Sequence, residues 1–385
     1  MIAEERKTLR ERKALIAGLA AAMALLLVVA AQWVPFGFKT TGLAEEWGLI
    51  TAAEKGRLVS PGYNPHRPLT PLPWSVGYLL SPNSFLGTNL VHALAFFGKA
   101  LFLYLILTRL RIHRVVAFVA ACLLVVYPSD AGLFTLRTTH IHISVFLYLV
   151  AAFLFLEFVR SRSWLAIFGS WLALAVGTAI YEVAFPLIFI TPLLGLWQQR
   201  RWNRSLLKAS ALWLVVPVVA FARFLMLFFS GQAERAVSLS AGTGFDWESI
   251  SSIASRIGVA YQRNIWSGWA ETIEILDHGT DYFAISAAVA LLVAGAAWYQ
   301  LKLGASEIAE PDSTRDLLVV CGVGFAIIAI GFLPYLPTVV RNQIWRVYIL
   351  PSIGAAAAFS SALYLMTRAF RPRRFRDAAF IALAA

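Results

Sequence analysis

The feature that most constrains this chain is a series of long apolar stretches separated by short polar segments. A helix needs about 20 mainly apolar residues to cross roughly 30 Å of hydrocarbon. We identify ten stretches that approach or reach this length: residues 14–34, 86–108, 112–128, 141–158, 164–181, 183–199, 209–229, 281–300, 317–333 and 346–367. Only 14% of the 385 residues are charged, against roughly 25% in an average soluble domain. The sequence therefore predicts an all-α, polytopic transmembrane helix bundle that forms a single domain over residues 1–385.

The two ends of the chain need separate interpretation. Residues 14–34 follow a basic segment, as the apolar part of a signal peptide does, but the stretch is longer than usual and Gln32-Trp33-Val34 is a poor cleavage site. We therefore predict that it is a retained span. At the other end, residues 378–385 are apolar and too few to cross a bilayer. We expect the chain to be incomplete there and to continue into at least one further span.

The distribution of basic residues predicts the orientation. Lys and Arg number 33 and exceed the 21 acidic residues, and in membrane proteins such residues are enriched in cytoplasmic segments. With the N-terminus in the cytoplasm, the cytoplasmic segments hold about twice as many Lys and Arg as the longer exterior segments. The excess positive charge thus indicates orientation, and we expect no nucleic-acid partner.

Two exterior loops are long, residues 35–85 and 230–280. In the second loop, apolar residues recur at helical spacing from Trp247 to Ile265, with Asp246 as a candidate N-cap. We predict an amphipathic helix that lies along the outer surface. In the first loop, the apolar stretch 69–80 is too short to span the membrane, so it is expected to be re-entrant or to lie on the surface.

Charged and polar side chains gather in the exterior segments, beside the ends of predicted spans. Charge at such depth is costly and usually has a reason. A carboxylate can take the proton from an attacking hydroxyl, and Arg binds phosphate oxygens through two parallel hydrogen bonds. Together they favour transfer of a group from a lipid phosphate. The candidate residues are Glu45, Glu46, His66, Arg67, Asp130, Arg137, Glu182 and Arg341.

The order of these residues resembles the first exterior loop of the GT-C glycosyltransferase superfamily. The resemblance is strongest to the bacterial protein-mannosyltransferase-like proteins and the eukaryotic transmembrane O-mannosyltransferases, in which an acidic pair follows the first span and a Tyr-Arg-Pro-Leu-like motif comes later. Here the pair is Glu45-Glu46 and the motif is Arg67-Pro68-Leu69. The segment 127–137 resembles the second exterior loop of the family. The resemblance covers the first six predicted spans, and this chain departs from it by having Glu where Asp is commoner.

The resemblance implies a membrane glycosyltransferase of a bacterial inner membrane, with a polyprenyl-phosphate sugar as donor and a protein, lipid or polysaccharide as exterior acceptor. It implies that Glu45 or Glu46 is the base and that Asp130 is a second acidic site. Arg67 and Arg137 would lie near the donor phosphate. We assign His66, Glu182 and Arg341 to substrate binding as well, because they belong to the same side. Some relatives use a divalent cation and others do not, so no cofactor is assigned with certainty.

Two alternatives stay open: a transporter or lipid flippase, and a non-catalytic GT-C-like membrane protein. The non-catalytic alternative stays open because this chain has Glu45-Glu46 where Asp is commoner in the family. A transporter favours internal repeats and charged residues distributed through the membrane depth. Here the charged residues and histidines that lie deep in predicted spans are few: His92, Lys99, Glu157 and Arg223.

Spacing along the helices gives two further expectations. His92 and Lys99 are seven residues apart and share one helix face, and we predict that Lys99 pairs with Glu157. His140 and His142 are two residues apart, so on a helix they point to different faces and do not form a metal pair.

Overall fold

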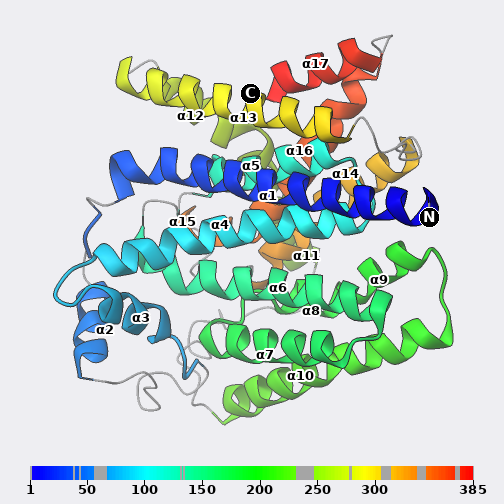
Figure 1. Cartoon of the computed structure of the whole chain (residues 1–385). Helices are drawn as coiled ribbons and strands as arrows, with labels where there is room; N and C mark the ends of the chain where they lie inside the picture. The colour runs from blue at the N-terminus through cyan, green and yellow to red at the C-terminus, as the bar shows by residue number, and fades with distance from the viewer. Residues whose placement is uncertain are drawn as a thin grey trace.

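The computed structural model describes residues 2–37, 40–42, 45–55, 67–130, 132, 135–230, 247–276, 280–304, 314–335, 344–368 and 373–384. Within these residues the chain folds into helices and contains no strand. The predicted all-α bundle is therefore confirmed for this part of the chain. Helices α4, α6 and α7 run side by side through its middle (Figure 1).

Six segments of the described residues are long and apolar enough to cross a membrane. They belong to α1 (Ile2–Phe36), α4 (Leu86–Arg109), α6 (Thr139–Ser161), α10 (Arg204–Phe229), α13 (Thr280–Gly304) and α14 (Thr314–Phe332). The helix assignments for these predicted spans are thus confirmed.

The other four predicted spans correspond to shorter helices. These are α5 (Arg114–Val126), α7 (Trp164–Ile180), the pair α8 (Phe185–Ile190) and α9 (Pro192–Gln199), and α16 (Pro351–Thr367), which follows the short α15 (Ile344–Val347). The stretch 183–199 is divided because Pro192 has no N–H to continue the helical hydrogen bonds. A total of ten spans therefore stays a prediction.

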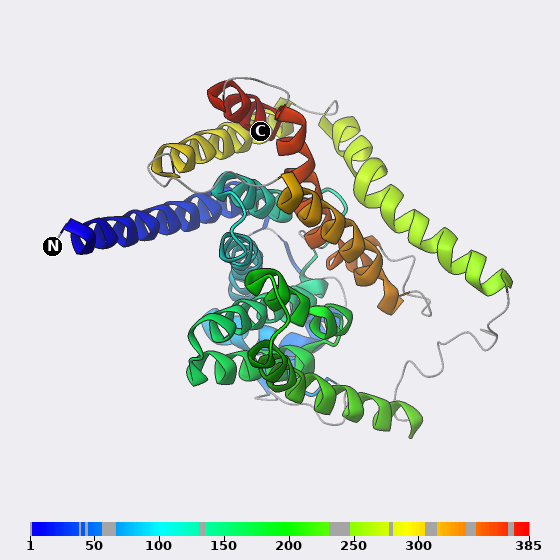
Figure 2. The same cartoon turned by 90° about the vertical axis from the view of Figure 1, so that its right-hand side faces the viewer.

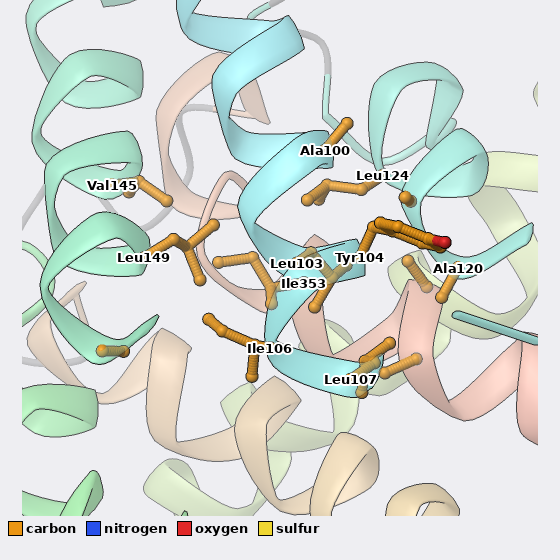
Figure 3. Close-up of a cluster of buried hydrophobic side chains, with 14 of the residues drawn as sticks. Ala100, Leu103, Tyr104, Ile106, Leu107, Ala120, Leu124, Val145, Leu149 and Ile353 are labelled. Carbon is orange, nitrogen blue, oxygen red and sulfur yellow. The ribbon is translucent and has the colours of Figure 1, made fainter. Parts of the chain in front are cut away.

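Helix α4 lies at the centre of the packing. Its side chains from Ala100 to Leu107 contact α6 on one side and α5 on the other, and Ile353 of α16 closes the cluster (Figure 3). In a bilayer, apolar side chains gain little by leaving lipid for protein, so helix association depends on close van der Waals packing. Helix α4 also contacts α3 and α1, so four helices are arranged around it.

Small residues bring helices together at two crossings. A methyl group added to Gly324 of α14 would lie 2.5 Å from the carbonyl oxygen of Gly354 in α16. A methyl group added to Gly77 of α3 (Leu72–Leu80) would lie 2.5 Å from Oγ1 of Thr88 in α4. At both crossings only a glycine lets the two backbones approach so closely.

Helices α2 (Glu45–Glu54) and α3 lie together at one end of the bundle (Figure 1). We call it the α2–α3 end. Ile50 of α2 packs against Phe85, just before α4, and Leu136, in the 3₁₀ turn η3 (Leu136–Thr138). The short apolar stretch 69–80 thus forms a nine-residue helix packed against α4 and α6.

The second long loop contains the predicted helix. It consists of α11 (Trp247–Gln262), the π-helical turn η5 (Arg263–Ser267) and α12 (Gly268–Leu276). Helix α11 runs along α14 (Figure 2), and the Tyr261 hydroxyl donates to the Phe325 carbonyl at 2.8 Å. Asp246, the expected N-cap, lies outside the described residues.

Helices α1 and α13 lie side by side in both views (Figures 1 and 2), and the Gln300 side chain donates to the carbonyl of Ala17 at 2.9 Å. The last helix, α17 (Arg373–Ala384), packs on α16 and α13. These contacts join helices from the two ends of the chain.

Candidate functional site

Asp130 lies at the α2–α3 end, in the turn that joins α5 to α6. Its backbone N–H donates to the Tyr127 carbonyl at 3.0 Å, and its carboxylate accepts the Gly132 N–H at 3.2 Å. The Thr138 hydroxyl donates to the Gly132 carbonyl at 3.1 Å. The turn therefore folds back on itself and places the Asp130 carboxylate beside the first turn of α6.

A buried lysine from α4 reaches this carboxylate. Lys99 Nζ lies 3.4 Å from Asp130 Oδ2 and 2.7 Å from Nδ1 of His142, which is on α6. His142 Nε2 lies 4.0 Å from Asp130 Oδ1. Lys99 and His142 are fully buried, and the ammonium also lies 4.0 Å above the centre of the Phe96 ring. A lysine, a histidine and an aspartate from three separate segments thus form one buried polar cluster.

The predicted pairing of Lys99 with Glu157 is wrong. Glu157 of α6 instead binds Arg109, the last residue of α4, and Arg160 at 2.9 Å. Lys99 is ten residues before Arg109, which places it about 15 Å further along the helix axis. At the position of Lys99 along α4, the carboxylate within reach is that of Asp130, because the turn after α5 places this side chain beside the first turn of α6.

His92 extends the cluster towards α1. Its Nδ1 lies 2.7 Å from the Thr139 hydroxyl, which itself donates to the Leu136 carbonyl at 2.6 Å. The His92 ring lies 5.1 Å from that of His142 and 5.1 Å from that of Trp33. His92 and Lys99 therefore face the same interior, as their spacing predicts.

Arg67 and Glu182 form a second charged group at this end. The guanidinium binds both carboxylate oxygens, with Nε 2.5 Å from Oε2, and lies 3.9 Å from the centre of the Tyr181 ring. Burial by itself would lower the pKa of Arg67, but the charge of Glu182 and its hydrogen bond raise it above the ordinary value. Two of the predicted substrate-binding residues thus bind each other.

The Arg67–Glu182 pair fastens the first loop to the turn between α7 and α8. The Leu69 N–H donates to the Ala179 carbonyl at 3.1 Å, and the Thr70 hydroxyl to the Ile180 carbonyl at 3.0 Å. His140 packs against Trp74 and Tyr181 on this side, whereas His142 faces Lys99. The prediction that the two histidines point to different faces is confirmed.

The acidic pair lies in the first turn of α2. Glu46 is buried, and α2 packs against η3, the turn that contains Arg137. The backbone of Glu45 belongs to the same helical turn. Glu46, Arg137 and Asp130 therefore come from three segments that meet at the α2–α3 end. His66 and Arg341 lie outside the described residues.

The second loop covers the Asp130 turn. The Ser129 hydroxyl donates to the side-chain oxygen of Asn264 at 2.6 Å, and the Tyr127 hydroxyl donates to the Asn264 carbonyl at 2.7 Å. Asn264 is fully buried within η5, where the helix widens to the π form. Such π-helical turns frequently occur at functional sites. Both long loops therefore contact the segment that joins α5 to α6: the second loop at Tyr127 and Ser129, and the first loop at η3.

Burial raises the pKa of the Asp130 carboxyl above its ordinary value, while the charge of Lys99 and the Gly132 N–H oppose that rise. A divalent cation would need several oxygen or nitrogen ligands. Among the described residues, no three His, Cys, Asp or Glu side chains gather in such a way, and the carboxylates of Asp130 and Glu182 already face cations. These residues do not fit a metal centre, and we derive no step through a metal.

Sequence reasoning missed three members of this region: Lys99 as the partner of Asp130, His142 as its neighbour and Asn264 as its cover. A signal existed for Lys99, because a lysine inside an apolar span requires a counter-ion. Spacing along one helix does not identify a partner on another segment, so Asp130 could not be chosen over Glu157. Asn264 belongs to the second long loop, and no pattern of its neighbours distinguishes it.

Neither the protein-family models nor the curated proteins include a match to this chain.

Proposed function

We propose that this protein is a membrane glycosyltransferase of GT-C type. It moves a sugar from a polyprenyl-phosphate carrier to an acceptor at the outer face of a bacterial inner membrane, and the α2–α3 end faces outward. Protein, lipid and polysaccharide acceptors are all compatible with this chemistry. Membrane lipid surrounds the apolar helices and is the phase from which the donor enters.

One observation supports the proposal: segments from distant parts of the chain that contain carboxylates pack together at one end of a bundle of apolar helices. Helix α2, which begins with Glu45 and Glu46, packs against η3 through Ile50 and Leu136, and Thr138 of η3 is joined to the Asp130 turn through Gly132. Glu46 is buried there instead of facing solvent. A site that handles protons needs such acidic groups in a place shielded from bulk water.

In the proposed reaction, Glu45 or Glu46 removes the proton from the acceptor hydroxyl. The hydroxyl oxygen forms a bond to the anomeric carbon of the sugar, and the bond from that carbon to the phosphate oxygen breaks. The polyprenyl phosphate leaves with the electron pair, and Arg137 beside α2 is the candidate to balance its charge. Asp130 supplies a fixed negative charge, which favours an oxocarbenium-like transition state.

The test replaces both glutamates with glutamine in purified protein reconstituted into vesicles with a panel of polyprenyl-phosphate sugars. The wild type should consume one of these donors. The double variant Glu45→Gln/Glu46→Gln should lose about 10²-fold or more of the transfer rate, the range that general-base catalysis contributes. Wild-type protein that consumes no donor of the panel contradicts the proposed function.

A matched control comes from the same helix. Glu54 is the last residue of α2 and is exposed, so Glu54→Gln should transfer sugar at the wild-type rate. If the double variant also keeps the wild-type rate, the acidic pair has no part in the chemistry.

A transporter or flippase is the second candidate, and the buried Lys99–Asp130–His142 cluster favours it, because charges inside membrane proteins often mark ion or proton pathways. Counterflow of labelled polyprenyl-phosphate sugar across the vesicle membrane, without formation of glycosylated product, would support this function in place of transfer.

A further inference from the structure

The hydrogen positions around Asp130 follow from the partners of each side chain. An ammonium group has three hydrogens and no free lone pair, so it can only donate. Lys99 lies 2.7 Å from His142 Nδ1, and Nδ1 is therefore the acceptor. In a neutral imidazole the hydrogen then sits on Nε2, the nitrogen that faces Asp130 Oδ1 at 4.0 Å.

The same reasoning places the hydrogen of the neighbouring His92 on Nδ1. The Thr139 hydroxyl has one hydrogen, which it donates to the Leu136 carbonyl at 2.6 Å. Its oxygen therefore accepts a hydrogen from His92 Nδ1 at 2.7 Å. Two buried histidines with rings 5.1 Å apart thus carry their hydrogens on different nitrogens.

Every polar group that faces Asp130 in the described structure is a donor. Lys99 lies 3.4 Å from Oδ2, and the Gly132 N–H donates to Oδ1 at 3.2 Å. The Nε2–H of His142 faces Oδ1, and a shift of the carboxylate by about 1 Å brings the two atoms to hydrogen-bonding distance. This donor set matches an ionised carboxylate, because each donor stabilises the charged form.

We propose that Lys99 and His142 are positioning residues for Asp130, and that they hold its carboxylate ionised and in a fixed orientation. Their role in sugar transfer rests on the proposed function, whereas the hydrogen-bond arrangement does not. Lys99 supplies the counter-charge from α4. His142 accepts a hydrogen from Lys99 and presents its own hydrogen to Asp130 from α6.

A purely structural role explains the cluster less well. Replacing a buried ion pair with apolar residues of similar volume is often neutral or stabilising, and apolar residues fill most of the surrounding core. The titratable groups that act on the cluster are Lys99 and His92 on α4 and His140 and His142 on α6, while the second loop contributes the neutral Asn264. A charge kept at this position in lipid points to chemistry that uses it.

The first test is nuclear magnetic resonance of ¹⁵N-histidine-labelled protein in lipid bilayers, with signals assigned from His142→Gln and His92→Gln variants. Wild-type His142 should be neutral with its hydrogen on Nε2, and His92 neutral with its hydrogen on Nδ1. In Lys99→Met, the His142 signals should change because the donor to Nδ1 is gone. A His142 hydrogen on Nδ1 in the wild type, or His142 signals unchanged in Lys99→Met, overturns the proposal.

The second test is the pH profile of sugar transfer. Without the charge of Lys99, the Asp130 carboxyl binds its proton more readily, so the acid limb of the Lys99→Met profile should move up by about 1 pH unit or more. His142→Gln places an amide donor near the former Nε2, and it should keep about tenfold more activity than His142→Asn. An unmoved acid limb, or equal activities of the two His142 variants, overturns the positioning role.

Lys302 provides the control, because it is an exposed lysine in the last turn of α13. Lys302→Met should change neither the His142 signals nor the pH profile. The resonance test needs no turnover. If Lys99→Met does not fold, the wild-type histidine signals alone still decide between the two hydrogen positions on His142. Absence of transfer with the predicted resonance pattern contradicts the proposed function only, and transfer with a different pattern contradicts only this inference.

Discussion

At the scale of single residues, Arg67 shows how one charge joins two distant segments. Its guanidinium binds both oxygens of Glu182 and lies over the Tyr181 ring. Planar guanidinium groups suit such bidentate contacts, which fix geometry as well as add energy. For Arg67 to bind a donor phosphate, as the family resemblance implies, at least one of these contacts has to be exchanged for the ligand. The ion pair and substrate binding are therefore competing uses of the same side chain.

Removing the charge of Glu182 should destabilise the protein. Glu182→Gln leaves a largely buried guanidinium beside a neutral amide, and we expect a loss of about 1–3 kcal/mol in the free energy of unfolding. The measurement is reversible unfolding in detergent micelles. The double variant Arg67→Gln/Glu182→Gln should recover part of the loss, because no unpaired charge remains.

Arg160→Gln is the control for this prediction. Arg160 is more than half exposed, at 58% of its side chain, and its partner Glu157 also binds Arg109. Exposed ion pairs contribute little, so the change should stay within about 0.5 kcal/mol. If Glu182→Gln is as stable as the wild type, the pair does not fasten the first loop.

At the scale of helices, close backbone approach determines which faces meet. Helices α14 and α16 cross where Gly324 and Gly354 face each other, and Ala358 lies beside them. In lipid such small residues stabilise a helix pair because they allow the longest run of van der Waals contacts. Gly324 thus serves the close packing of α14 on α16.

A methyl group at this crossing should weaken it. In Gly324→Ala the new carbon would lie 2.5 Å from the Gly354 carbonyl oxygen and 2.9 Å from Ala358 Cβ, so the helices must move apart. We expect a loss of about 1–3 kcal/mol in unfolding free energy, the usual effect of overpacking. Gly322→Ala is the matched control, because nothing lies within 4 Å of its added carbon. Equal stabilities of the two variants would show that the crossing tolerates expansion.

At the scale of the whole molecule, the two ends of the bundle differ in content. The α2–α3 end contains the Asp130 turn, the Arg67–Glu182 pair and the η5 cover. The opposite end contains Arg109, Glu157 and Arg160 and the link between α9 and α10. The positive-inside rule assigns the opposite end to the cytoplasm.

This orientation can be measured by labelling single cysteines. In a Cys122→Ala/Cys321→Ala background, Lys55→Cys after α2 should react with a membrane-impermeant maleimide in intact spheroplasts. Arg201→Cys, between α9 and α10, should react only after the membrane is permeabilised, since both native side chains are exposed at opposite ends of the bundle. The reverse labelling pattern would invert the topology and place the candidate site in the cytoplasm.

Much of the fold could be predicted because lipid leaves few choices. Long apolar stretches must be helices, since backbone groups cannot stay unpaired in hydrocarbon, and the structure has helices at these stretches. The predicted boundaries of individual spans were less accurate: Pro192 divides one stretch into two helices, and several helices are shorter than a full span. Which of the shorter helices cross the bilayer depends on neighbours and lipid contacts that length does not measure.

The candidate site divides in the same way. Residue types and their order along the chain were enough to predict that Glu46, Asp130, Arg67 and Glu182 belong to one end of the bundle. The partners of these residues were decided only by tertiary structure: Lys99 pairs with Asp130 instead of Glu157, and Glu157 pairs with Arg109. A charge in an apolar span requires a counter-ion, which the sequence alone establishes. Which counter-ion it meets depends on helix depth and rotation, and these are set by packing between segments that are far apart in the chain.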